Sequence, residues 1–135
     1  MKHKKKGKKL NRSTHQRKAL YRSLISSLIL KEQIKTTESK AKAIKRLVDK
    51  LISKAKDGSL HIRRQILAFL PNNKAVNKLV DEVAPRFKDR VSGFTKFTKL
   101  QRRKGDNALI VRVELTEKKK EELKSKGIKA KEDKK

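Results

Sequence analysis

The side chains that most often perform chemistry are few in this chain, and their spacing supports no reaction. The histidines His3, His15 and His61 are not spaced as metal ligands, and the chain has no cysteine to complete a site. The segment Gly7-Lys8-Lys9 lacks the second glycine and the hydroxyl residue of a phosphate-binding loop. We therefore predict a protein that is not an enzyme and that uses no metal and no cofactor.

Lysine and arginine are the groups that the chain holds in excess. There are 41 of them against 14 aspartates and glutamates, which gives a net charge of +27 and a pI near 10.7. Residues 1–18 hold nine of them and no acid. Such a chain repels itself unless anions neutralise it, and nucleic acid is the usual source of a dense line of negative charge. We therefore expect a nucleic-acid partner.

The residue types indicate what kind of contact this would be. Lysine dominates over arginine, which favours binding of backbone phosphate over reading of base edges. The aromatic residues are too few for a single-strand stacking platform, and neither a zinc finger nor a helix-turn-helix with reading residues is visible. These features favour a small folded body that recognises the shape and charge of a folded nucleic acid.

Local signals predict the elements that must position these cations. The capping box Ser13-Thr-His-Gln16, followed by apolar residues at helical spacing, predicts a helix over residues 14–31. The short β-prone stretch Ile34–Thr37 leads into a second helix, capped by Thr37 or Ser39. That helix has one apolar stripe, and its opposite face is almost wholly cationic. The cations are Lys40, Lys42, Lys45, Arg46, Lys50 and Lys54.

A solvated helix face usually mixes charges, so this cationic face is a second indication of an anionic partner. The carboxylates Asp49, Asp81 and Glu82 are interpreted as ordinary charges on helix surfaces.

Two shorter helices and a hairpin are predicted to follow. Ser59 caps the third helix and Asn73 the fourth, which we expect to end before Pro85 because the residue preceding a proline is driven out of the helical region. Residues 94–100 and 108–115 read as strands of an antiparallel hairpin around the basic loop Gln101–Asn107. The second strand alternates, with Leu109, Val111, Val113 and Leu115 on one face. The predicted fold class is therefore α+β, with about four helices packed on a small sheet built around the C-terminal hairpin.

The chain divides into three parts. Residues 1–12 form a basic N-terminal arm, 13–115 a single α+β domain, and 116–135 a tail rich in lysine and glutamate, for which a frayed helix and disorder both stay open. No apolar run approaches the roughly 20 residues that span a bilayer, and the start lacks the apolar stretch of a secretory signal. We expect an intracellular, cytoplasmic protein.

Several segments carry a resemblance to one family, in collinear order over residues 1–115. The chain begins with Met, a basic residue and His, followed by a Gly four positions after the His and by Leu-x-Arg. A second motif, Ile-x-Thr-Thr, precedes a basic-Ala-basic step. A third pattern lies near the C-terminal end of the domain. The segments are Met1–Arg12, His15–Leu24, Ile34–Lys42, Pro85–Phe87, Arg90, Gly93–Thr95, Arg103–Ala108 and Val113–Leu115. They resemble the bacterial large-subunit ribosomal protein L-seventeen family; the tail 116–135 lies outside the resemblance.

The resemblance implies a structural constituent of the large ribosomal subunit, on its solvent side near the exit of the nascent-peptide tunnel. It implies contact with large-subunit ribosomal RNA and with the neighbouring protein L-thirty-two, without membrane contact or homo-oligomer formation. It also implies that the Ile34–Thr37 stretch joins the hairpin in one sheet. By position, the RNA-facing residues are Lys2, His3, Lys4, Lys5, Lys6, Lys8, Lys9, Arg12, Arg17, Arg22, Lys35, Thr36, Thr37, Lys40, Lys42, Arg86, Arg90, Arg102, Arg103 and Lys104.

Two other functions are compatible with the composition. A nucleoid-type protein that compacts DNA would need the same charge, and it would bind duplex DNA as tightly as structured RNA. A module that docks on anionic membranes would use helices with lysine-rich faces, but such helices usually carry bulky aromatics on the apolar face. These helices use mainly Leu, Ile, Val and Ala, which favours the ribosomal reading.

Overall fold

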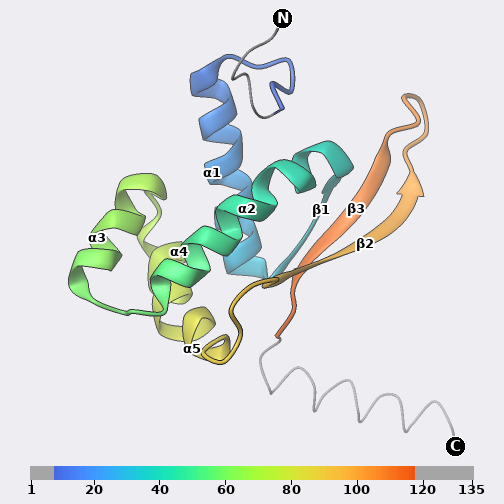
Figure 1. Cartoon of the computed structure of the whole chain (residues 1–135). Coiled ribbons are helices and arrows are strands. Elements are labelled where there is room, and N and C mark those ends of the chain that lie inside the picture. Colours follow the sequence, from blue (N-terminus) through green and yellow to red (C-terminus); the bar gives the residue numbers. More distant parts are fainter. Residues whose placement is uncertain (1–7, 118–135) are drawn as a thin grey trace, which may run out of the picture.

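A computed structural model describes residues 8–117 of the chain (Figure 1). The predictions that fall on residues 1–7 and 118–135, including five RNA-facing positions of the arm, lie outside the described residues. In chain order the elements are α1 (Thr14–Lys31), β1 (Gln33–Thr37), α2 (Glu38–Ala55), α3 (Leu60–Phe69), α4 (Asn73–Asn77), the π-helical turn η1 (Lys78–Val83), α5 (Ala84–Arg86), β2 (Thr95–Arg102) and β3 (Leu109–Leu115).

The three strands form one antiparallel sheet in the order β1-β3-β2. Val113 of β3 pairs with Ile34 on one side and with Phe97 on the other. The predicted hairpin is therefore confirmed, as is the expectation that the Ile34–Thr37 stretch joins it. The α+β fold class is confirmed as well.

The helices lie on one side of the sheet, and the tip of the β2–β3 hairpin projects beyond them (Figure 1). The apolar stripes predicted for the helices and for β3 meet in one core, with Phe87 and Phe94 edge to face at 5.2 Å between ring centroids. The buried residues include Ile25 and Leu28 of α1, Ile44, Val48 and Ile52 of α2, Ile66 of α3, Val76 of α4, Leu79 and Val83 of η1, and Val111, Val113 and Leu115 of β3. Burying this surface supplies the main stabilising free energy of the fold.

Two predicted helix boundaries were wrong. The cap of α4 is Asn72, whose side chain accepts a hydrogen bond from the Ala75 amide at 3.2 Å, so Asn73 is already helical. The helical run also continues through Pro85 to Arg86 instead of ending before the proline. The wider π-helical turn η1 precedes the proline, which then lies in the first turn of α5, where its missing N–H breaks no helical bond.

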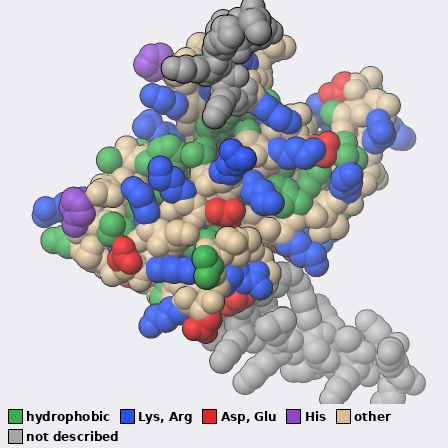
Figure 2. Space-filling view, viewed as in Figure 1, with side chains coloured by type: hydrophobic (Ala, Val, Ile, Leu, Met, Phe, Trp, Pro, Cys, Tyr) green, Lys and Arg blue, Asp and Glu red, His purple; other side chains and the backbone are tan. Residues whose placement is uncertain are grey.

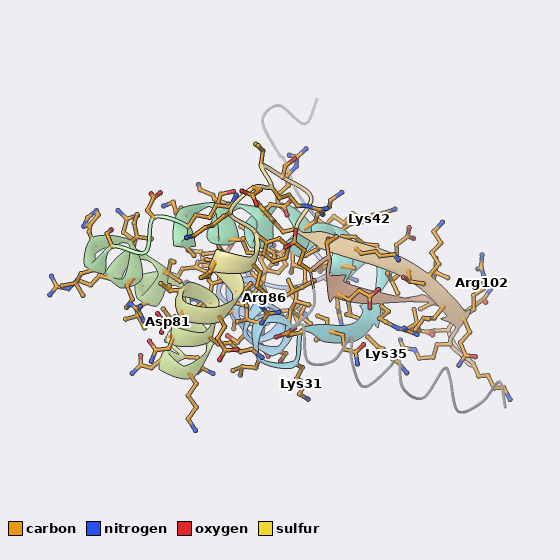
Figure 3. All side chains as sticks on the ribbon, turned by 90° about the horizontal axis from the view of Figure 1, so that it is seen from below. Lys31, Lys35, Lys42, Asp81, Arg86 and Arg102 are labelled. Carbon is orange, nitrogen blue, oxygen red and sulfur yellow. The ribbon has the colours of Figure 1, made fainter. Side chains whose placement is uncertain are left out.

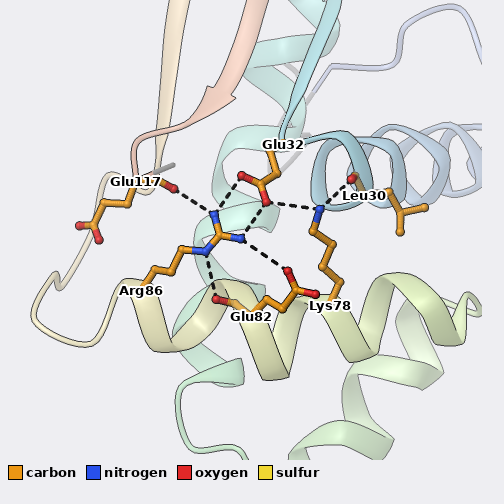
Figure 4. Close-up of polar contacts among 6 residues, drawn as sticks. All are labelled: Leu30, Glu32, Lys78, Glu82, Arg86 and Glu117. Carbon is orange, nitrogen blue, oxygen red and sulfur yellow. Dashed lines mark hydrogen bonds and ion pairs between the residues drawn. The ribbon is translucent and has the colours of Figure 1, made fainter. Parts of the chain in front are cut away.

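A network of ion pairs fixes the corner between α1 and β1 (Figure 4). Glu32 has left-handed backbone there (φ 59°), and its carboxylate accepts hydrogen bonds from the Arg86 guanidinium at 2.7 and 2.9 Å. Lys78 lies 3.3 Å from the same carboxylate and donates to the Leu30 carbonyl at 2.8 Å. The hydrogen bond from Arg86 lowers the pKa of the Glu32 carboxyl below its usual value. The corner is thereby tied to η1 and α5.

Candidate nucleic-acid interface

The described part of the arm is held against the start of α1. Arg17 donates to the carbonyls of Lys9 and Arg12 at 3.4 and 3.2 Å, and the Tyr21 hydroxyl donates to the Lys8 carbonyl at 3.4 Å. The side chains of Lys8, Lys9 and Arg12 are exposed. Arg17, a predicted RNA-facing residue, therefore also directs the base of the arm.

The predicted cationic face of α2 is present and carries one carboxylate at its start. Lys42, Lys45, Arg46 and Lys50 are exposed, and Glu38 pairs with Lys42 at 2.6 Å. The hydrogen bond from Lys42 lowers the pKa of the Glu38 carboxyl. Figure 2 shows Lys and Arg side chains spread over the face that α2 presents, with fewer acidic ones between them.

A first hollow, which we call the α2 hollow, joins this face to the sheet. It has a volume of about 250 Å³. Phe97 of β2 forms its floor, and the Lys45 ammonium lies 5.6 Å from the centroid of that ring. Lys45 and Lys99, which line it, were not among the predicted contacts. The lining residues are Glu38, Lys42, Lys45, Phe97, Lys99 and Val111.

A second, larger hollow lies on the face of the sheet turned away from the helices, and we call it the outer hollow. It measures about 660 Å³. It brings Lys35 of β1 together with the predicted basic loop at the hairpin tip, two segments far apart in the sequence (Figure 3). The lining residues are Lys35, Leu100, Gln101, Arg102, Arg103, Lys104, Ile110 and Arg112.

Arg112 is a lining residue that sequence reasoning missed, although a signal for it existed. Side chains of a strand alternate between its two faces, and Val111 and Val113 are buried against the helices. Arg112 must therefore face the other way, where β1 pairs it with Lys35. The pairing of β1 with β3 could not be predicted from local patterns, because the two strands are far apart in the sequence.

The basic loop is shaped by an internal clamp. The Arg103 guanidinium contacts both carboxylate oxygens of Asp106, with Nε at 3.0 Å, and Asp106 also accepts from the Ala108 amide at 3.3 Å. The hydrogen bond from Arg103 lowers the pKa of the Asp106 carboxyl to about 2. Gly105 supplies the positive φ (102°) that the turn needs. Arg103 thus holds the loop that carries Arg102 and Lys104.

Three more predicted RNA-facing arginines have contacts within the fold. Arg86 pairs with Glu32, and only 15% of its side chain is exposed. Arg90 donates to the Gly93 carbonyl at 3.1 Å. The Arg22 guanidinium lies 5.9 Å from the Phe69 ring, and its buried Nε has no hydrogen-bond partner within residues 8–117.

The remaining predicted residues lie where β1 passes into α2. Thr36 and Thr37 pair with Val111 and Ile110 in the sheet and are half-buried, as is Lys40. Thr37 is the cap of α2 but makes no side-chain capping bond. Thr36 adjoins the α2 hollow through its strand partner Val111, and Thr37 adjoins the outer hollow region through Ile110.

Two of the carboxylates interpreted as helix-surface charges, Asp81 and Asp49, have partners within the fold. Asp81 pairs with Arg63 at 2.6 Å, as expected of a helix-surface charge. Asp49 does more, because its carboxylate accepts from the Phe94 amide at 3.3 Å and so holds the start of β2 against α2. Within residues 8–117, no group of three or more His, Cys, Asp or Glu could hold a metal ion. No helix in the same range has the length and apolarity of a membrane span.

Fold and surface together define a small, strongly basic α+β protein whose distinguishing groups are cations set around a three-stranded sheet. Comparison with known proteins identifies the family. The profile of the family described as Ribosomal protein L17 matches residues 20–116.

Individual relatives agree with this match. A large ribosomal subunit protein bL17 of Desulforapulum autotrophicum is 42% identical over 115 residues, covering 85% of this chain and 96% of the relative. The bL17 of Clostridium perfringens is 44% identical over 108 residues, covering 80% and 96%. The bL17 of Geobacter metallireducens is 40% identical over 132 residues, covering 96% and 74%.

The chain therefore belongs to the ribosomal protein L17 family, a family of large-subunit ribosomal proteins. This confirms the resemblance found in the sequence. The protein has a structural role in the ribosome, and its family confirms the prediction that it is not an enzyme. Membership places the protein in the ribosome, and so in the cytoplasm.

Proposed function

We propose that this protein binds folded large-subunit ribosomal RNA by neutralising its phosphates and fitting its shape. The observation that carries the proposal is the convergence of cations from separate segments on two hollows, one on each face of the sheet. Lys35 of β1 and Arg112 of β3 meet at the outer hollow, while Lys42, Lys45 and Lys99 meet at the α2 hollow. Bringing so many like charges together costs free energy, which an RNA backbone offsets by supplying phosphate.

The proposed contact residues follow from exposure and partners. Cations on the arm, the α2 face and the hairpin contact phosphate directly: Lys8, Lys9, Arg12, Lys35, Lys40, Lys42, Lys45, Lys99, Arg102, Lys104 and Arg112. The resemblance adds Lys2 to Lys6, Thr36 and Thr37. Arginines that contact the fold position these groups instead, and they are Arg17, Arg22, Arg86, Arg90 and Arg103.

We further propose the placement that the resemblance implies. The protein would enter the subunit as a single copy, on the solvent side near the tunnel exit. It would lie beside other large-subunit proteins, including L-thirty-two. The faces not used for RNA, such as α3 with its exposed Leu60, are then available to those neighbours.

Salt dependence of RNA binding tests the proposed function. The triple variant Lys42→Gln, Lys45→Gln, Lys99→Gln removes three charges at the α2 hollow. Binding of the full chain to large-subunit ribosomal RNA is measured over a series of salt concentrations, with duplex DNA as competitor. Each lost phosphate contact should lower the slope of log affinity against log salt by roughly 0.7–0.9.

A matched control removes three charges elsewhere. Arg64, Lys74 and Lys88 are exposed and line neither hollow, so changing all three to Gln should leave the slope nearly as in the wild type. Equal slopes for the two triple variants would contradict the proposal. Equal affinity for duplex DNA and ribosomal RNA would favour the DNA-compacting alternative.

A further inference from the structure

The outer hollow differs from the α2 hollow in its chemistry. Its floor is aliphatic, formed by Leu100 and Ile110, which are both half-buried. Lys35 and Arg112 stand at one end of this floor, and the basic loop stands at the other. An apolar floor between two cationic ends is more than the binding of phosphate requires.

A bulge in β2 lies beside this floor, toward the hairpin tip. Lys99 pairs with Val111 and Arg102 pairs with Leu109, so β2 uses three steps where β3 uses two. Such an extra residue bends the strand and redirects its side chains. Leu100 lies on the outer face with Ile110 because it follows Lys99, which pairs with the inward-facing Val111. Beyond the bulge, Arg102 lines the same hollow toward the tip.

Among residues 8–117, no aspartate or glutamate lines the outer hollow. Asp106 contacts Arg103 in the loop clamp and does not line the hollow. Glu114 lies two residues beyond Arg112 on the same strand, but it is 8% exposed and does not line the hollow either. The rim thus keeps a cationic excess around an apolar floor.

A partner that fits must be anionic and must also offer an apolar surface between its negative charges. A continuous duplex backbone offers phosphate and hydroxylated ribose, but no flat apolar face that could cover Leu100 and Ile110. A nucleotide lifted out of its stack offers the flat face of a base between two phosphates. The hollow, about 660 Å³ in volume, lies in the size range of small-ligand pockets, roughly 300–1,000 Å³.

We propose that the outer hollow holds one unstacked nucleotide of the bound RNA. Its base lies on Leu100 and Ile110, and its flanking phosphates meet Lys35 with Arg112 at one end and Arg102 with Lys104 at the other. The Arg103–Asp106 clamp sets the position of the second end. This inference rests on the proposed function and names which part of the RNA enters one site.

The test separates base contact from phosphate contact. The double variant Leu100→Thr, Ile110→Thr makes the floor more polar. Threonine suits a strand and the net charge of the protein is unchanged. Binding of the full chain to large-subunit ribosomal RNA should weaken by about fivefold to tenfold. This is the low end of what a base stacked on an aromatic side chain contributes, because this floor is aliphatic. The salt slope should stay as in the wild type, since no phosphate contact is lost.

Leu60→Thr is the matched control, because Leu60 is 63% exposed on α3 and lines neither hollow. Chemical probing of the RNA should reveal a nucleotide whose base is unstacked by the wild type and the control but not by the double variant. If the double variant binds as tightly as the control and unstacks the same nucleotides, the inference is overturned, and an acidic, partly apolar protein segment becomes the better occupant. That result leaves the proposed function intact, because the proposed function is tested separately by the salt slopes of the two triple variants.

Discussion

Replacing Glu32 by glutamine should destabilise the fold more than any other single carboxylate change at this corner. The carboxylate accepts two hydrogen bonds from Arg86, at 2.7 and 2.9 Å, and lies 3.3 Å from Lys78. A glutamine amide keeps the shape but loses the charge, and it places an N–H toward the guanidinium. Hydrogen bonds to charged groups contribute roughly 1.5–3 kcal/mol each, and breaking a fully buried pair costs roughly 3–5 kcal/mol.

The network is not fully buried, because the Glu32 and Arg86 side chains are 12% and 15% exposed. We therefore expect the free energy of unfolding to fall by about 2 kcal/mol, which for a domain of this size lowers Tm by roughly 10 °C. Urea unfolding of the full chain at fixed ionic strength measures this change in the free energy of unfolding. Glu82→Gln is the matched control, since Glu82 is 3.9 Å from the same guanidinium but 46% exposed, and it should cost less than about 1 kcal/mol.

The same pair gives a pH dependence whose sign is fixed. Arg86 lowers the pKa of Glu32 in the folded state below the ordinary value of 4.5. The stabilisation is therefore fully present above pH 4.5 and is lost as the pH falls through the lowered folded pKa. Glu32→Gln should lack this acid-side loss. Equal stability of the two glutamine variants at neutral pH would refute the reasoning.

Two further predictions concern the other local devices. Ser13→Ala removes one half of the capping box at the start of α1 and should lower the free energy of unfolding, measured in urea, by about 1 kcal/mol. An unchanged urea midpoint would show that the arm, and not the cap, stabilises this helix end. Asp106→Asn breaks the clamp on Arg103 and should weaken RNA binding by about threefold to tenfold. The Tm should stay nearly constant, because the clamp is exposed. RNA binding equal to that of the wild type would show that the loop needs no fixed shape.

Local signals in the sequence were enough to predict most of the fold. The capping box at Ser13, the hydroxyl cap at Ser59 and the regular apolar stripe of α2 each act within a few residues, and the structure contains all three. The alternation in β3 likewise predicted which side chains reach the core. In each case the free energy that selects the element depends on near neighbours in the chain.

The two errors in the helix boundaries came where neighbouring signals compete. Asn72 and Asn73 are equally good caps by residue type. In the structure Asn72 has the extended backbone of a cap, and Asn73 is already helical. Pro85 ends a regular α-helix, but a π-helical turn before it makes room. The pairing of Arg86 with Glu32 could not be predicted from local signals, because the two residues lie 54 positions apart in the sequence.

The candidate interface was predicted in part for the same reason. The arm and the α2 face stand out because their charges are contiguous in the chain or repeat at helical spacing. Arg112 and Lys99 are single cations in strands, and only the pairing of β1, β2 and β3 brings them beside other cations. The two hollows are products of tertiary structure and have no sequence signature.

Cross-linking of RNA to protein in assembled large subunits, followed by mass spectrometry of the linked peptides, tests the central claim most directly. If RNA is bound where the cations converge, linked peptides should come from β1, the exposed face of α2 and the β2–β3 hairpin, which contain Lys35, Lys42 and Arg112. Peptides from α3 to α5 serve as an internal comparison. Links confined to α3–α5, with none on α2 or the hairpin, would contradict the account.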